Sequence, residues 1–529
     1  MPKLLFFLLI ILCSVGSRAQ NWKVYPYHPK GSLLSFPADE GHHPSQAIEW
    51  WYTAGKLTAA SGKTYSYMLS YFYYPAASFD GFRILNITDE ATGEFYRDTK
   101  PVHYPVLSDS LLDLHASVYS SSDEKWITRK DSNGKLLPFE YTIKAASSAA
   151  SIDLNYKSLK RPLILADSGY LQEGLTSYTY YYSETGNEVS GELTLNGTTE
   201  NVTGTAWIDR QYGDFNPWTG EKYEWFLLQL SNGMDINLWN VFTADNQIPD
   251  NAKYRILSAY VNDSTQYTSA DFKIERLGFN RMPDSQMCYA DKWRLTSEKN
   301  KIDLTITTTH KNSEVQFPFR FFEGATGISG KVNNVDVTGF GFAELLHSYA
   351  PPTLSIKYPD AGVFDSEIPV NWQLLNPDDG RPVTYDLSYS IDNKVSFTSI
   401  AEGISDTSYL WKNAAVKPGE VIWFKIVARS VDNTLTGTVI SKAASNVVSG
   451  RSSTLRLFPN PVSAVLYFEP SFQMDNPACS IIDETGKAVR IYKSNSLSNR
   501  IDVSFLPKGI YFFRIEKGSK PETIKFIKK

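Results

Sequence analysis

The chain has 529 residues, enough for several domains, and its 42% hydrophobic content is ample for well-packed cores. A net charge of −5 excludes the basic footprint of a protein that binds nucleic acid. Aromatic residues reach 14%, with 32 Tyr and 12 Trp, which favours β-strands first and a ligand site lined by rings second.

Residues 1–19 have the pattern of a signal peptide. Lys3 supplies the positive charge, residues 4–12 form an apolar run, and a small-x-small cleavage site precedes Gln20. No later stretch reaches the ~18 apolar residues of a membrane-spanning helix, so we expect an exported chain without a transmembrane span. The Cys and His residues lack the spacing of a metal site, and we expect no metal and no other cofactor.

From residue 49 the pattern predicts β-strands. Residues 63–73 alternate, with Tyr or Leu on one face and Thr64, Ser66, Met68 and Ser70 on the other. Asn-Gly pairs at 133–134, 196–197 and 232–233 lie between strand-like runs, as two-residue hairpin turns do. The order Glu, Trp, aromatic residue occurs at 49–51 and again at 224–226, each time before a hairpin, which indicates two copies of one strand-rich unit.

Residues 204–214 join an apolar run to a cluster of polar groups. In a strand, Trp207 and Asp209 share one face, and Ile208 and Arg210 share the other. A carboxyl beside an indole on an apolar face is held in its acid form by desolvation, as a general acid requires. The alternative is an ordinary ion pair between Asp209 and Arg210 at a strand end.

Three separated motifs then carry a family resemblance. They are His-His-Pro at 42–44 with Glu-Trp-Trp-Tyr at 49–52, the run 204–213, and Phe-Glu-Gly-Ala at 322–325 followed by Gly339, Gly341 and Glu344. Over residues 40–349 the chain resembles the AttH and carotenoid 1,2-hydratase group. The resemblance implies an all-β fold with two lipocalin-like β-barrel halves, at residues 20–200 and 201–350. Members of this group are often labelled only as predicted secreted hydrolases.

The resemblance also implies site residues. Asp209 matches the proton-donating Asp of the hydratase, and Trp207 stands where that family has a Tyr. The family's His-x-Trp pair falls on Tyr180 and Tyr182, which removes a base or water-positioning group, so hydration itself does not follow. The aromatic residues expected to bind the substrate are Trp50, Trp51, Tyr52, Tyr180, Tyr182, Trp207, Tyr212, Trp225 and Trp239.

Four polar residues are expected to support this site: Glu49, Arg210, Glu224 and Glu323. Glu49 and Glu224 precede the lining Trp residues and need a partner if they are buried, and Arg83, Arg210, Arg255 and Arg294 are the candidates. Glu323 and Glu344 lie near glycines, where hydrogen bonding to a turn is the expected role.

The remaining residues predict two smaller β-sandwiches. Residues 351–449, with a core Trp at 372, are similar to an immunoglobulin or fibronectin type III module. Residues 450–529 carry Leu-Phe-Pro-Asn-Pro-Val at 457–462 and a basic end, and they resemble the C-terminal sorting domain of type IX secretion in Bacteroidetes. The implied partner is the type IX translocon, acting through residues 455–529, and the implied location is the medium or the cell surface.

Two hypotheses of function stay open. In the first, the chain is a hydratase-like or isomerase-like lyase in which Asp209 protonates a C=C bond of a long apolar substrate in a β-barrel cleft. In the second, the same aromatic cavity carries a lipid or isoprenoid-like ligand without chemistry. Asp209 exposed to a cavity, and not held by a bidentate Arg, favours the enzyme.

Overall fold

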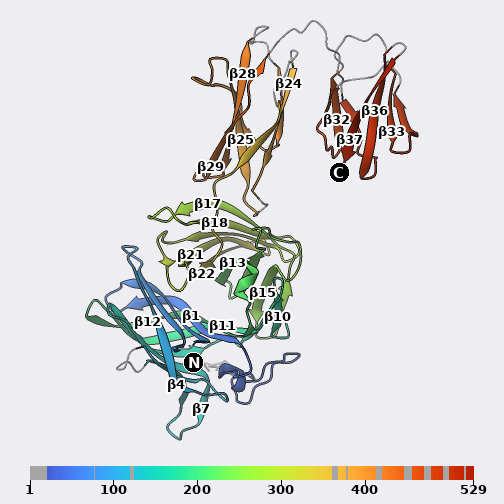
Figure 1. Cartoon of the computed structure of the whole chain (residues 1–529). Coiled ribbons are helices and arrows are strands. Elements are labelled where there is room, and N and C mark those ends of the chain that lie inside the picture. Colours follow the sequence, from blue (N-terminus) through green and yellow to red (C-terminus); the bar gives the residue numbers. More distant parts are fainter. Residues whose placement is uncertain are drawn as a thin grey trace, which may run out of the picture. The chain divides into compact units, whose positions relative to one another are not determined.

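The computed structural model describes residues 21–76, 78–118, 124–359, 367–376, 379–412, 420–445, 456–469, 478–492, 500–517 and 520–529. The expected signal peptide, residues 1–19, lies outside the described residues. Within these ranges the regular elements are β-strands and two 3₁₀ turns, η1 (Ala38–Glu40) and η2 (Pro217–Thr219), which confirms the all-β prediction (Figure 1). None of the helices found there is long and apolar enough to cross a membrane.

The first half is a closed antiparallel barrel. Its strands follow in the order β11, β12 and β1 to β8, and β8 pairs again with β11 to complete the circuit. Two short strands, β9 (Leu163–Ile164) and β10 (Tyr170–Glu173), pair with β11 from outside this circuit. The barrel strands are β1 (Ile48–Ala59), β2 (Thr64–Ala76), β3 (Phe79–Asp89), β4 (Phe95–Leu107), β5 (Asp113–Ser117), β6 (Glu124–Lys130), β7 (Leu136–Ala146), β8 (Ala150–Ser158), β11 (Ser177–Leu195) and β12 (Thr198–Asp214).

The second half is a ten-stranded antiparallel sheet that stays open, with β16 and β17 at its two edges. It is therefore a half-barrel, where the resemblance implied a second barrel. Its strands are β13 (Lys222–Leu230), β14 (Asp235–Phe242), β15 (Arg255–Asn262), β16 (Thr265–Ser269), β17 (Lys273–Arg281), β18 (Cys288–Ser297), β19 (Ile302–Thr308), β20 (Glu314–Val315), β21 (Phe321–Val332) and β22 (Val335–Leu345).

The register supports the predicted repeat of the Glu-Trp motif. Trp50 on β1 lies opposite Gln211 on β12, and Trp225 on β13 lies opposite Glu344 on β22. The strand with the motif has equivalent neighbours in both halves. β1 lies between β2, which follows it in the chain, and β12, and β13 lies between β14 and β22 in the same way. Equivalent positions of the two sheets can then be compared strand by strand.

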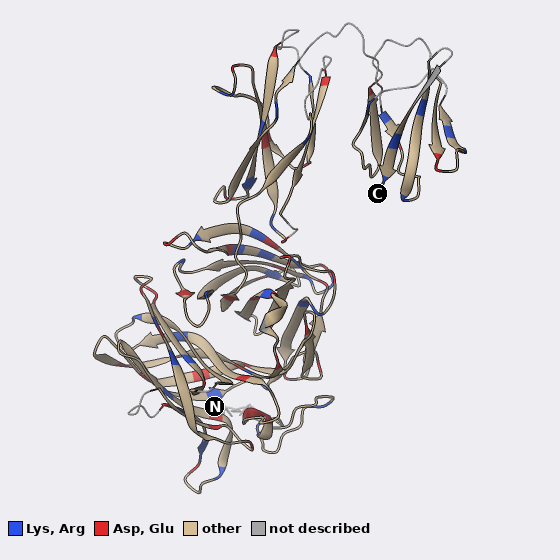
Figure 2. Ribbon diagram, in the orientation of Figure 1, with Lys and Arg blue, Asp and Glu red and all other residues tan. Residues whose placement is uncertain are grey.

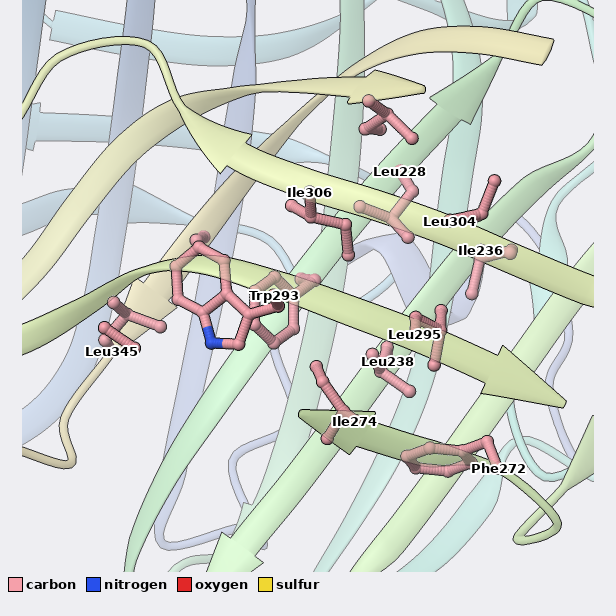
Figure 3. Packing of buried hydrophobic residues seen from close by; sticks show 14 of the residues in the cluster. Leu228, Ile236, Leu238, Phe272, Ile274, Trp293, Leu295, Leu304, Ile306 and Leu345 are labelled. Atoms are coloured by element: carbon pink, nitrogen blue, oxygen red, sulfur yellow. The ribbon is translucent and has the colours of Figure 1, made fainter. Parts of the chain in front are cut away.

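Alternation along these strands creates separate cores. Trp51 and its same-face neighbours fill the barrel, whereas Trp50 and Tyr52 face the opposite way. In the second sheet, Phe226 and Leu228 belong to a large cluster that includes Trp293, Leu295 and Ile306 (Figure 3). A third cluster, from the outer faces of both sheets, joins Tyr52, Trp207, Trp225 and Trp239. Burying it holds the two halves together.

The C-terminal region has two sandwiches, as predicted. The first combines the sheet β23 (Leu354–Tyr358), β24 (Glu367–Leu374) and β27 (Ser408–Lys412) with the sheet β25 (Val383–Ser390), β26 (Thr398–Ile404), β28 (Val421–Ser430), β29 (Thr436–Ile440) and β30 (Ala444–Ser445). Trp372 is buried in it and packs on Tyr385, with ring centroids 5.4 Å apart. The second combines β31 (Arg456–Phe458), β32 (Val465–Glu469) and β35 (Arg500–Asp502) with β33 (Cys479–Asp483), β34 (Ala488–Tyr492), β36 (Gly509–Lys517) and β37 (Lys520–Lys528).

Two compact units result. One contains the chain up to Pro351 together with Asn376–Val383 and Arg429–Thr436, and the other contains the rest of the C-terminal region. In the first unit the loop 429–436 packs on the second sheet, because Asp432 Oδ2 accepts a hydrogen bond from the Phe279 backbone N–H at 2.8 Å. Acidic and basic residues are interspersed along the described chain (Figure 2), in keeping with the small net charge.

Candidate active site between the two sheets

A cavity of about 610 Å³ lies between the outer face of the barrel and the second sheet. Its volume suits a small organic molecule. The cavity is thus outside the barrel, whereas the sequence predicted a cleft within it. Its walls are mostly rings and aliphatic groups, with four charged residues among them. The lining residues are Ile48, Trp50, Tyr52, Phe72, Tyr74, Phe82, Ile84, Asp209, Gln211, Phe215, Gly220, Glu221, Lys222, Tyr223, Trp225, Trp239, Pro318, Phe319, Phe321, Glu344 and Leu346.

The two walls use equivalent positions of the two sheets. Trp50 and Trp225 are equivalent, and each faces a ring on the next strand, Phe72 and Trp239 respectively. All four line the cavity. The equivalence extends to the polar residues, because Gln211 and Glu344 are the partners of the two Trp residues. The same backbone arrangement therefore presents an amide on the barrel wall and a carboxyl at the equivalent position of the second sheet.

Asp209 is the acid of the barrel wall. It is buried, and its Oδ1 accepts hydrogen bonds from the Ser183 hydroxyl at 2.5 Å and from the Trp207 indole N–H at 2.7 Å. The Tyr181 hydroxyl donates to Oδ2 at 2.8 Å and itself accepts from the Asn237 amide at 2.6 Å. The two oxygens are thus unequal: Oδ1 has two donors, and Oδ2 has one.

The acidity of Asp209 follows from this environment. Desolvation by burial raises the pKa of the carboxyl to about 7, although hydrogen bonds from Ser183, Trp207 and Tyr181 act in the opposite direction. Among the described ion pairs, none involves Asp209. The sequence alternative of an Asp209–Arg210 pair is wrong, because alternation sends Arg210 to the barrel side. Oδ2, which has one donor, is the oxygen with a lone pair left for a proton. A carboxyl with a pKa of about 7 keeps its proton up to neutral pH, as a general acid does.

Glu323 and Glu344 form a second acidic group. They are Cα partners across β21 and β22; Glu323 is buried, whereas Glu344 lines the cavity and is only partly buried. The Tyr52 hydroxyl donates to Glu323 Oε1 at 2.9 Å, and the Tyr223 hydroxyl donates to Glu344 Oε1. Burial raises the pKa of both carboxyls, and the charge of Glu344 raises that of Glu323 further.

These contacts correct the sequence interpretation of the two residues. Hydrogen bonding to a turn was the expected role, but both lie within strands and their hydroxyl donors are phenols from other strands. Glu323 is the positional equivalent of Tyr181, because each pairs with the residue that faces the motif Trp. The sequence hides the equivalence of Glu344 and Gln211, because the two residues lie at different separations from their partner Trp residues along the chain.

Two buried ion pairs support the site from behind. Glu49 pairs with Arg210, whose guanidinium also lies over the Trp51 ring, 4.0 Å from its centroid. Glu224 pairs with Arg276, with Nη2 and Oε2 2.6 Å apart. In each pair, the glutamate of the Glu-Trp motif is bound to a buried arginine on another strand of the same half. Of the four arginines proposed from sequence only Arg210 is a partner, and Arg276 was missed because its strand lies 52 residues away along the chain.

Several expected lining residues lie elsewhere. Trp51 is in the barrel core, and Trp207 sits behind Asp209 as its hydrogen-bond donor. A separate cluster contains Tyr180, Tyr182 and Tyr212. They pack there with Trp22 and Phe36 of the lead-in segment, the residues that precede β1. The members of the predicted binding set that line the cavity are Trp50, Tyr52, Trp225 and Trp239. Alternation alone separates Trp51 from Trp50 and Tyr52, whereas the positions of the other misplaced residues depend on which segments pack against their strands.

The described residues show no evident set of metal ligands. Among those residues no three His, Cys, Asp or Glu side chains gather as metal ligands would. The candidate site is accordingly composed of carboxyl, phenol and indole groups, which hold, donate and accept protons.

The chain matches two family models. A model described as AttH-like matches residues 27–349, and one described as a secretion system C-terminal sorting domain matches residues 456–529. This type IX sorting domain implies secretion or attachment at the cell surface. No curated protein matches the sequence.

Three solved structures illustrate the similarities. A protein described as AttH from Nitrosomonas europaea has 20% identity and a TM-score of 0.49, over 61% of this chain and 99% of that one. Kievitone hydratase from Nectria haematococca has 16% identity and a TM-score of 0.48, over 61% and 99%. A two-domain fibronectin type III segment of chicken tenascin has 17% identity and a TM-score of 0.13, over 34% and 98%.

Proposed function

Because the chain belongs to the AttH-like family, we propose that it binds a long apolar molecule between its sheets and protonates a C=C bond of that molecule through Asp209. Proton addition to a C=C bond is the first step of hydration and of double-bond isomerisation alike. The name of kievitone hydratase supplies hydration as one precedent for this fold. The proposed ligand is lipid-like or isoprenoid-like, and the sorting domain puts the reaction outside the cytoplasm.

One observation carries the proposal: Asp209 lines an apolar cavity and has no cationic partner among the described ion pairs. An acid held by an Arg remains ionised and has no proton to give. Asp209 is instead neutral below its raised pKa of about 7, and its hydrogen-bond donors hold it in one orientation. These features are those of a general acid.

A carrier is the second candidate, because the cavity walls alone suffice to hold an apolar molecule. Trp50, Phe72, Trp225 and Trp239 supply rings from both sheets. In that case Asp209 is a structural acid, and its replacement leaves the bound molecule chemically unchanged. The two candidates therefore differ in turnover and agree in binding.

The test begins with the ligand. Lipid extracted from protein purified from its secreting host, and identified by mass spectrometry, provides the compound for a turnover assay. Asp209→Asn keeps the size of the side chain and removes its proton, so turnover should fall by about 10²–10⁴ while binding stays within a few fold. Glu184→Gln is the matched control, since Glu184 is equally buried, also has a pKa raised to about 7, and accepts its hydrogen bond from Tyr141 in the barrel.

The outcomes separate the candidates. Loss of turnover in Asp209→Asn with normal turnover in Glu184→Gln supports the enzyme. Equal turnover in all three proteins rules out Asp209 as the acid. If the extracted compound is bound by the wild-type protein and returned unchanged, the carrier is the correct candidate.

A further inference from the structure

Besides Glu221, the cavity is lined by acidic groups on two different walls, Asp209 and Glu344, and proton donation by Asp209 uses only one of them. Glu344 faces the same cavity from β22 of the second sheet, with Glu323 beside it. Of the ion pairs among the described residues, none involves either glutamate. Their polar contacts are instead with each other and with the Tyr52 and Tyr223 hydroxyls. A carboxyl pair in which each member has one phenol donor, and one member lines the cavity, calls for a role.

The pair acts as one acid that carries at most one negative charge. Two carboxyls in contact cannot both ionise, so they hold one proton in common. The Tyr52 and Tyr223 hydroxyls donate to the pair and stabilise the charge that remains. That charge reaches the opposite wall, because the charge of Glu344 also raises the pKa of Asp209 and so keeps the Asp209 proton in place.

Protonation of a C=C bond has a consequence for the ligand. The Oδ2–H bond of Asp209 breaks, the π electron pair forms a new C–H bond, and the second carbon is left with a positive charge. The charge disappears when a water oxygen bonds to that carbon, or when an adjacent C–H bond breaks, and in both cases the released proton returns to the Asp209 carboxylate. Until then the cation must be stabilised within a cavity whose walls are mostly apolar.

We propose, on the basis of the function proposed above, that Glu344 with Glu323 stabilises this positive charge from the wall opposite Asp209. The rings of Trp50, Trp225 and Trp239 complete the environment, because aromatic faces attract cations. The lining residue Lys222 does not neutralise the wall, since its sequence neighbour Glu221 lines the cavity too. Asp209 thus starts the reaction, and the glutamate pair preferentially binds the charged state that follows.

The proposal predicts a binding preference that needs no knowledge of the natural ligand. A quaternary ammonium is a stable copy of a carbocation, so (6-hydroxyhexyl)trimethylammonium is compared with 7,7-dimethyloctan-1-ol, which has carbon in place of the charged nitrogen. Calorimetric titration of the full chain should show about tenfold tighter binding of the ammonium. Equal affinities for the two probes in the wild-type protein would overturn the proposal, whatever the variants do.

The variants locate the charge. Glu344→Gln should reduce the preference to about twofold or less, because the remaining Glu323 does not line the cavity. Glu323→Gln should keep the preference, since Glu344 then ionises alone beside an amide donor. Glu184→Gln, the buried acid of the barrel interior, should match the wild type. A preference that survives in Glu344→Gln would assign the effect to the rings and overturn the role of Glu344.

The experiment also distinguishes this inference from the proposed function. Asp209→Asn should retain the ammonium preference while it loses turnover. A preference without loss of turnover in Asp209→Asn would contradict the general acid and leave the charged wall standing. Loss of turnover without any preference in the wild type would contradict the charged wall alone. Circular dichroism of each variant establishes that the probes are compared on folded proteins.

Discussion

Asp209 and Glu49 lie on neighbouring strands of one barrel, and their surroundings change their acidities in opposite directions. Burial raises the pKa of Asp209 to about 7. Burial also acts on Glu49, but Arg210, His42 and His43 outweigh it and hold the pKa of that carboxyl far below its usual range. One carboxyl is adapted to keep a proton, and the other to keep a charge.

This contrast predicts opposite effects of pH on stability. Asp209 retains its proton in the folded state, so the free energy of unfolding falls as pH rises from ~4 to the folded pKa of about 7. Asp209→Asn removes that dependence and should gain stability relative to the wild type across the same interval, by at most ~4 kcal/mol. Chemical denaturation of both proteins at a series of pH values measures the difference.

Glu49 gives the opposite sign. Its folded pKa lies below its unfolded value, so its contribution is present above pH ~4.3 and is lost as pH falls below that value. Glu49→Gln also leaves Arg210 buried without its partner, so we expect a loss of about 3–5 kcal/mol at pH 7. The deficit should shrink in acid. A deficit that grows below pH 4 in the same denaturation series would contradict this assignment.

The strands β1 and β12 bring the acid of the barrel wall to the cavity, and glycines allow them to approach closely. A Cβ added at Gly55 would lie 2.4 Å from the Thr205 carbonyl oxygen and 2.9 Å from the Ala206 Cβ. Such a contact cannot be relieved without moving one backbone against the other. Gly55 therefore sets the spacing of the strand pair that carries Asp209.

Gly55→Ala should consequently destabilise the fold by about 1–3 kcal/mol through overpacking. Gly327→Ala provides the control, because a Cβ at Gly327, also on a strand, meets no atom within 4 Å and should change stability by less than ~0.5 kcal/mol. Thermal unfolding of the two variants decides the matter. Equal melting temperatures would show that the barrel accommodates a methyl group at this position.

At this scale the sequence could predict which residues share a face of a strand, but not which residues of other strands they contact. Period-two alternation separated Asp209 from Arg210 correctly, because it depends only on local geometry. The partner of Arg210 is Glu49, which is 161 residues away, and the partner of Glu224 is Arg276 on another strand. Such pairs depend on sheet order, which no local pattern specifies. For the same reason Tyr180 and Tyr182 were expected at the ligand and lie against the lead-in segment.

The whole molecule joins the AttH-like region to a C-terminal sorting domain that has its own core. The residues of that core, from Leu457 to Phe526, all belong to the terminal sandwich. The motif at 457–462 and the basic end made this domain recognisable from sequence, and the family model that matches residues 456–529 confirms the prediction. A domain with a separate core is expected to fold, and to be lost, without its neighbours.

Deletion of residues 455–529 should therefore abolish appearance of the protein in the medium or at the cell surface, because the address read by the secretion system is missing. The melting temperature of the remaining protein should change by less than 2 °C or so, since the two sheets keep their clusters. Fractionation of cells that express each form, followed by calorimetry, tests both statements. Unchanged export of the truncated form would show that the address lies elsewhere.

The placement of Asp209 and Glu344 on different sheets has a consequence for the shape of the product. A C=C bond is flat, and a molecule held between two walls presents one face to each. Asp209 can deliver its proton only to the face turned toward β12, while the opposite face is turned toward β22. When the protonated carbon becomes a stereocentre, we expect a product of a single handedness, which chiral chromatography of the reaction mixture would reveal.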